Sequence, residues 1–178
     1  MSAAHESVVV LSRALDQTGD LLADIHEDQL SLPTPCAEWN LGRLVAHVVN
    51  DPRNFLEMAH GHEVDWSAQP ETAPTGWAAE FRSSADDLIH YWHQLGDSVE
   101  PGQADWQTAE FAVHSWDLAR AIGSTKWLDP EVAERGLALM SGALTPDNRG
   151  AAFAPEVPVP DGAPIYDRLA AYAGRDPR

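Results

Sequence analysis

Cysteine and long apolar runs are nearly absent from this chain. Its single cysteine, Cys36, cannot form a disulfide within the chain, so nothing indicates an oxidising compartment. No apolar stretch approaches the roughly 20 residues that a helix needs to cross a bilayer. The N-terminal segment reads MSAAHESVVVLSRALDQ and lacks the basic start of a signal peptide. We therefore expect a cytoplasmic protein that does not bind membranes.

Basic side chains are also scarce. The sequence has 11 lysine and arginine residues against 28 aspartate and glutamate residues, which gives a formal net charge of -17. Such an acidic surface repels phosphate backbones, so we expect no nucleic-acid partner. The 44% share of hydrophobic residues and the seven tryptophans argue against disorder. A length of 178 residues suits one domain, over residues 1–178, and the sequence does not indicate an oligomeric state.

Apolar residues recur with helical spacing in four segments. These segments lie at about residues 5–28, 41–55, 77–95 and 104–122. Asn40 is the expected N-cap of the second helix, and Gly123 suits the end of the fourth. No segment alternates with a period of two, which argues against a β-sheet.

Proline-rich segments separate and follow these helices. Residues 61–75 read as a loop, and Asp129 precedes a proline and an acid that are typical of a short fifth helix. Residues 145–164 contain five prolines and predict an extended arm, after which residues 165–172 form a last helical turn or two. The simplest architecture is all-α: a four-helix bundle with a short fifth helix and a Pro-rich C-terminal extension, residues 145–178.

The fourth predicted helix carries two side chains of metal-ligand type. Glu110 and His114 are four residues apart, so their side chains meet on one helix face. The same stripe contains Trp106, Ala109 and Val113, which are expected to face the core. A charge there is costly unless it is compensated, and a buried metal ion would compensate it. A surface Glu–His pair is the alternative, because such spacing is common on helices.

His47 on the second predicted helix is the third candidate. It follows Leu44 by one turn and precedes Val48, a position where a histidine is more often a packed core residue than a ligand. The case for a ligand improves if helices two and four face each other, since helical bundles build metal sites from facing helices. His90 and His93 have a similar spacing but share a face with acidic side chains, so we expect them to be solvent-exposed.

Three segments carry a family resemblance. They read TPCAEWNLGRLVAHVV at residues 34–49, AEFAVHSWDLARAIG at 109–123 and FAPEVPVPDGAPIYDRLAAYAGRDP at 153–177. The first two resemble motifs of the DinB-like metal-binding superfamily, in its mycothiol-dependent maleylpyruvate isomerase branch. The third resembles the tails of single-domain actinobacterial members that are described only as metal-binding proteins.

The resemblance implies a four-helix bundle that binds a divalent metal, often zinc or nickel. One ligand comes from the second helix and two from the later helix, and carried over to this sequence these are His47, Glu110 and His114. The resemblance also implies mycothiol as a thiol cofactor. Asp117 lies one turn beyond His114 and is the candidate to orient a ligand or a bound water, with a pair to Arg120 as the alternative.

A site with three protein ligands favours catalysis, because it leaves coordination positions open. A divalent ion held by two neutral histidines and one carboxylate keeps a net positive charge, which lowers the pKa of a bound water or thiol. We therefore expect a thiol-dependent transferase or isomerase that acts on a small electrophilic molecule. A metal enzyme that needs no thiol (a hydrolase, cyclase or isomerase of a biosynthetic pathway) and a non-catalytic module that binds metal or a small ligand stay open as alternatives.

Two further expectations concern the nucleophile and the reaction. Cys36 lies in a loop with no basic residue nearby in the sequence to lower its pKa, so we do not expect it to be the nucleophile. The two-domain isomerases of the branch have a C-terminal domain that contributes to catalysis, whereas this sequence ends at Arg178. We therefore do not expect maleylpyruvate isomerisation itself.

Overall fold

Helices make up the regular secondary structure of the chain. The computed structural model describes residues 2–36, 38–70, 73, 75–150 and 153–178, and it has no strand within these ranges. The predicted loop at 61–75 and the predicted arm at 145–164 each contain residues outside the described ones. The helices are α1 (Ala3–Ala23), α2 (Leu41–Ala59), α3 (Trp77–Leu95), α4 (Pro101–Ile122), α5 (Pro130–Ala143) and α6 (Ile165–Tyr172), with 3₁₀ turns η1 (Glu27–Gln29) and η2 (Gly96–Ser98). The all-α prediction is confirmed.

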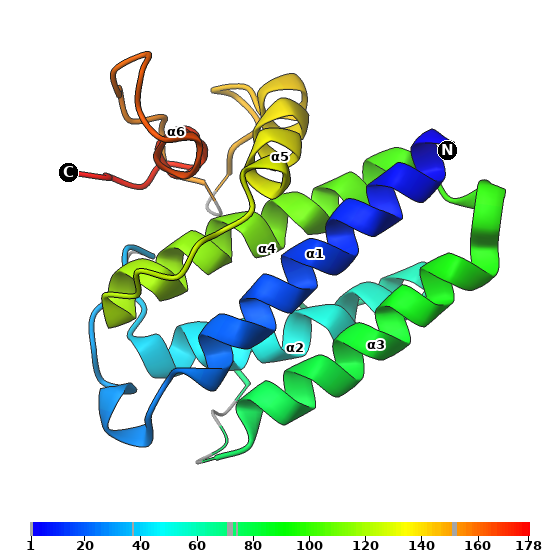
Figure 1. Ribbon diagram of the computed structural model, residues 1–178, viewed down its shortest axis with the longest axis horizontal. Coiled ribbons are helices and arrows are strands. Elements are labelled where there is room, and N and C mark those ends of the chain that lie inside the picture. Colours follow the sequence, from blue (N-terminus) through cyan, green and yellow to red (C-terminus); the bar gives the residue numbers. More distant parts are fainter. Residues whose placement is uncertain (1, 37, 71–72, 74, 151–152) are drawn as a thin grey trace.

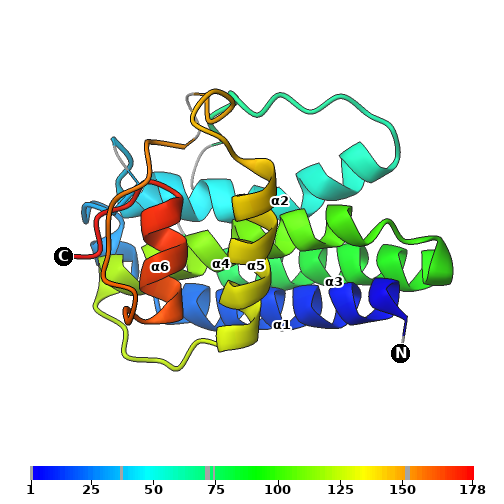
Figure 2. The same ribbon diagram turned by 90° about the horizontal axis from the view of Figure 1, so that it is seen from above.

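The four long helices α1 to α4 lie side by side and form the bundle (Figure 1). Helices α2 and α3 run in the same direction, because the connection between them returns along the length of the bundle (Figure 2). Helices α5 and α6 pack on α4 and cross the bundle axis at a steep angle (Figures 1 and 2). As a result, α4 is covered by the bundle on one side and by α5 and α6 on the other.

The helix ends follow from local hydrogen bonds. The Asn40 side chain accepts a hydrogen bond from the Arg43 amide at the start of α2, as predicted. At the start of α5, Asp129 accepts from the Glu131 amide. Gly123 ends α4 in the left-handed region, with a φ of 64° that glycine adopts without strain.

Three boundaries differ from those predicted by three residues or more, and the first is that α2 continues to Ala59 rather than about residue 55. Helix α1 ends at Ala23 rather than near residue 28, and the Gln29 side chain accepts a hydrogen bond from the His26 amide in the 3₁₀ turn that follows. Helix α4 begins at Pro101, three residues earlier than predicted. Proline is favoured at the first helical position, where no helical partner exists for its missing N–H.

The core lies between the four long helices. The rings of Phe81 on α3 and Phe111 on α4 are fully buried and meet edge to face, with centroids 5.9 Å apart. Trp106 departs from the predicted apolar stripe of α4, because 36% of it is exposed and its ring contacts Phe153 of the C-terminal extension. Within the described part of the chain, no helix is both long enough and apolar enough to span a bilayer.

Helix α5 approaches the backbone of α4 closely at Gly136. A Cβ atom on Gly136 would lie 3.1 Å from the Cα atom of Ala109. Ala109 directly precedes Glu110, so this contact fixes α5 against the part of α4 that carries the candidate ligands. Within the C-terminal extension, the segment before α6 is hydrogen-bonded to that helix, because the Val157 amide donates to the Ala171 carbonyl.

We predict that Gly136→Ala lowers the free energy of unfolding by about 1 kcal/mol, because the added methyl group meets backbone that cannot move aside cheaply. Gly142→Ala on the same helix is the matched control. Nothing lies within 4 Å of a Cβ there, and alanine has the higher helix propensity, so stability should hold or rise by up to about 1 kcal/mol. Urea denaturation of both variants measures the difference, and equal stabilities would contradict the tight contact.

Candidate metal centre

Helices α2 and α4 face each other and bring the three predicted ligands together. The Oε1 atom of Glu110 lies 3.1 Å from Nε2 of His47 and 3.0 Å from Nε2 of His114. The Nε2 atoms of both histidines therefore converge on one carboxylate oxygen. The sequence predicts this grouping, and that these side chains bind a metal stays a prediction.

Asp51 is a fourth member of the cluster, and the sequence analysis missed it. It lies one turn after His47 on α2, and its Oδ2 atom is 3.2 Å from the His47 Nε2 atom. One ligand-type atom from each of His47, Asp51, Glu110 and His114 lies within 4.8 Å of the other three. The readable signal was the spacing of four residues between His47 and Asp51, which is the spacing of Glu110 and His114.

Trp39 covers one side of the cluster. This residue precedes α2, and its ring centroid lies 4.9 Å from that of His47. It also stacks against the His114 ring at 6.5 Å, with only 16° between the planes. The side chains of His47 and Glu110 each keep 22% of their surface exposed, whereas that of His114 keeps 7%. The cluster is therefore open to solvent at His47 and Glu110 and largely closed at His114.

Burial and the neighbouring charges shift the pKa values of all four side chains in the cluster. Burial opposes the charged form of Glu110, but the charge of His114 and hydrogen bonds from both histidines hold its pKa well below the usual range. For His114, burial again opposes the charge, and the Glu110 carboxylate raises its pKa well above the usual range. Burial lowers the pKa of His47. Burial, and then the charge of Glu110, raise the pKa of Asp51 well above that of an ordinary carboxyl group.

This donor set fits a divalent metal ion. Imidazole nitrogens and carboxylate oxygens are the ligands that first-row divalent ions use in proteins. The side chain of Asp51 is fully buried, and within the described part of the chain neither of its oxygens has a hydrogen-bond partner. A buried carboxylate without a partner is costly, and a cation between the two acids would remove that cost. The site therefore has an orphaned polar group where an ion would sit.

Asp117 lies behind His114, on the side away from Glu110. Its Oδ2 atom is 3.1 Å from the Nδ1 atom of His114. Arg175 donates to both oxygens of Asp117, from Nε at 3.2 Å and from Nη2 at 2.9 Å. The alternative pair with Arg120 does not form, because Arg120 contacts Asp167 and the Pro177 carbonyl instead.

The contacts of Asp117 keep its carboxylate charged. Burial would raise its pKa, but the hydrogen bond from His114 and the charge of Arg175 lower it below the usual value. A charged Asp117 holds a proton on Nδ1 of His114, so Nε2, which faces Glu110, is the nitrogen that would bind a metal ion after losing its own proton. Asp117 is thus placed to orient His114.

Arg175 also reaches the single cysteine. Its Nη2 atom lies 3.7 Å from the Sγ atom of Cys36, although 139 residues separate the two. The sequence showed no basic residue near Cys36, and only the fold brings this one close. Burial is the largest influence on the thiol and raises its pKa, despite the lowering effects of His114 and Arg175. Cys36 is therefore not primed as a thiolate.

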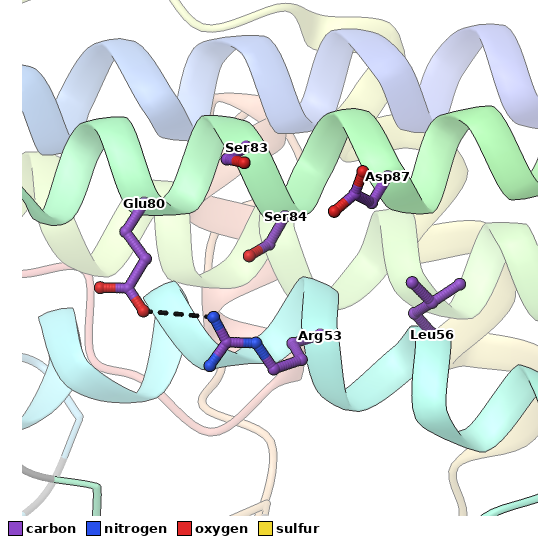
Figure 3. A pocket seen from close by; sticks show the side chains of 6 residues that line it. All are labelled: Arg53, Leu56, Glu80, Ser83, Ser84 and Asp87. Carbon is purple, nitrogen blue, oxygen red and sulfur yellow. Dashed lines mark hydrogen bonds and ion pairs between the residues drawn. The ribbon is translucent and has the colours of Figure 1, made fainter.

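One pocket adjoins the cluster and another lies apart from it. The adjoining pocket has a volume of about 300 Å³, and its lining includes His47, Asn50 and Asn54 of α2. The pocket of Figure 3 lies between α2 and α3, where Arg53 and Glu80 pair at 3.3 Å. This second pocket has no histidine in its lining, and its one basic residue, Arg53, is paired with Glu80. The exposed His90 and His93 of α3 also lie outside the cluster, as expected.

Comparisons with known proteins show which family the chain resembles. A family model described as the mycothiol maleylpyruvate isomerase N-terminal domain matches residues 11–119, which include Asp117 but not Arg175. Two uncharacterized proteins of Mycobacterium tuberculosis, from the strains CDC 1551 / Oshkosh and ATCC 25618 / H37Rv, are each 34% identical to the chain over 182 residues. Each alignment covers 93% of this chain and 96% of the relative. No solved structure matches the chain significantly.

We predict that the wild-type chain binds about one divalent ion and that His47→Ala and His114→Ala each abolish this binding. A three-ligand site loses most of its affinity with one ligand gone. His90→Ala and His93→Ala, on exposed surface, are the matched controls and should keep the ion. Elemental analysis after metal reconstitution and desalting gives the stoichiometry. A full complement of metal in either cluster variant would exclude that histidine from the site.

We predict that Asp117→Asn weakens metal binding by about 10–100-fold, because the amide no longer fixes the proton and orientation of His114. Asp167→Asn is the control, since Asp167 contacts Arg120 and Trp116 but no member of the cluster. Competition titration against a chromophoric chelator measures both affinities. An unchanged affinity in Asp117→Asn would show that the contact to His114 has no influence on the site.

Proposed function

The chain belongs to the mycothiol maleylpyruvate isomerase N-terminal domain family, and from this premise we propose that it is a divalent-metal-dependent transferase or isomerase. Its substrate would be a small electrophilic molecule, and its co-substrate or cofactor a low-molecular-weight thiol, with mycothiol preferred. The observation that carries the proposal is the convergence of His47, Glu110 and His114 at the solvent-open edge of a buried cluster.

Each residue of the cluster has a distinct role in this proposal. His47, Glu110 and His114 hold the ion, which when bound supplies a positive charge that stabilises a thiolate and polarises an electrophile. Asp117 keeps a proton on Nδ1 of His114, and Arg175 keeps Asp117 charged. Trp39 shields the two imidazole rings from water on one side. A drier site strengthens the electrostatic interactions among these groups.

The thiol has to come from outside the chain. Cys36 is the only cysteine, and burial raises the pKa of its thiol. A neutral thiol is a poor nucleophile, because the thiolate is the reactive form. The pocket beside His47 offers an entry for a small thiol, and the amides of Asn50 and Asn54 offer hydrogen bonds to polar groups of a ligand.

We predict that loss of a small electrophile such as a reactive halide, an epoxide or an enone requires metal and an added thiol. Mycothiol should support a higher rate than glutathione, and chelation should abolish turnover. Cys36→Ser should keep the activity, because the added thiol provides the nucleophile. The assay follows consumption of the electrophile with the thiol present and absent.

The outcomes separate the three function classes. Equal turnover without any thiol would overturn the thiol-dependent proposal in favour of a metal enzyme that needs none. No turnover of any electrophile by the fully metal-loaded protein would favour a binding module. Loss of activity in a folded Cys36→Ser variant would show that the nucleophile is Cys36 and not the added thiol.

A further inference from the structure

We propose that Asp51 is a fourth protein ligand of the metal, and that the site therefore holds a six-coordinate ion such as manganese, iron, cobalt or nickel rather than tetrahedral zinc. The inference rests on the proposed metal site and goes beyond it, because neither the family resemblance nor the sequence analysis includes Asp51. Three independent features of the structure support it: the atom that Asp51 faces, its lack of partners and the pairing of ligands on the helices.

The first feature is the histidine nitrogen that each aspartate faces. Asp117 contacts Nδ1 of His114, the nitrogen that points away from Glu110. That is the position of a carboxylate that orients a ligand from behind. Asp51 instead lies 3.2 Å from Nε2 of His47, the same nitrogen that faces Glu110 at 3.1 Å. Asp51 therefore faces the nitrogen that would bind the ion, whereas Asp117 faces the other nitrogen of a ligand histidine.

The second feature is the missing hydrogen-bond partners of Asp51. Its side chain is fully buried on α2, yet neither carboxylate oxygen has a hydrogen-bond partner among the residues that the structure describes. The Nε2 atom of His47 lies 3.2 Å from Oδ2 of Asp51, but its hydrogen bond is made with Oε1 of Glu110 instead. Buried polar atoms in folded proteins almost always have partners, so an orphaned carboxylate beside three ligand-type groups indicates an ion.

The third feature is the pairing of ligand types on the two helices. Helix α2 carries His47 and Asp51 four residues apart, and α4 carries Glu110 and His114 at the same spacing. Side chains at this spacing lie on one helix face, so each helix presents one imidazole and one carboxylate to the other. Helical bundles hold metal ions with such inward-facing pairs from different helices.

Four protein ligands change which ion suits the site. Zinc prefers four tetrahedral ligands, so two histidines and two carboxylates would close its coordination shell, as in structural sites. An ion that accepts six ligands keeps two positions open, enough for a thiol and an electrophile together. A second carboxylate ligand also shifts the preference toward the harder ions of the series, because carboxylates suit manganese, whereas imidazoles suit zinc, iron and nickel alike.

The experiment compares metal affinities of Asp51→Asn and the wild type, with Mn²⁺ and Co²⁺ in competition with a chelator. Removal of a partner behind a ligand typically costs about 10–100-fold, so loss of a ligand itself should cost about 100-fold or more. Asp86→Asn, which removes one exposed acid of α3, should leave the affinity unchanged. The metal-free Asp51→Asn variant should melt no lower than the metal-free wild type, because no hydrogen bond is lost. A loss of metal affinity well below about 100-fold in Asp51→Asn would show that Asp51 is not a ligand.

A second measurement needs no variant. The wild-type chain loaded with Co²⁺ should show the weak visible absorption of a six-coordinate ion, whereas the intense bands of a tetrahedral ion would overturn the inference. These measurements distinguish loss of the whole metal site from loss of the fourth ligand alone. If the wild type binds no ion, the proposed function fails with the inference. If it binds one ion with intense bands and Asp51→Asn matches its affinity, the proposed function stands and only the role of Asp51 is lost.

Discussion

The need to compensate buried charge between α2 and α4 governs the rest of the structure. Glu110 and Asp51 lie in an apolar bundle, where a carboxylate is stable only beside positive charge or hydrogen-bond donors. The two imidazoles provide part of that compensation, and an ion would provide the remainder. Because the same helices also supply the core, the cluster and the hydrophobic packing fix each other's geometry.

Much of the fold could be predicted from local patterns, whereas the three candidate ligands were selected by local spacing together with the family resemblance. Apolar periodicity located the helices, and Asn40 and Asp129 marked helix starts by the same hydrogen bonds that the structure shows. The spacing of Glu110 and His114 put two polar groups on one face, which is a property of the helix itself. His47 needed one further assumption, that α2 faces α4, and the structure confirms it.

The roles of Asp51 and Arg175 could not be predicted from the sequence, because they depend on tertiary structure. Asp51 has a readable spacing from His47, but an acid beside Pro52 in the middle of a helix gives no sign of whether it faces solvent or the core. Arg175 lies 58 residues from Asp117 and 139 from Cys36 along the chain, so no local pattern connects them. Contacts of this range follow only from how α5, α6 and the residues after them fold back over α4.

The position of Arg175 has a practical consequence for handling this protein. Its buried guanidinium holds Asp117 in place, although Arg175 lies in the segment after α6 and not in one of the bundle helices. A polyhistidine purification tag fused directly after this segment would attach next to the residues that hold the site and would itself compete for divalent ions. The N-terminus lies at the opposite end of the bundle, away from the C-terminus (Figures 1 and 2). A cleavable tag belongs at the N-terminus, where its removal leaves the Arg175 contacts and the metal stoichiometry undisturbed.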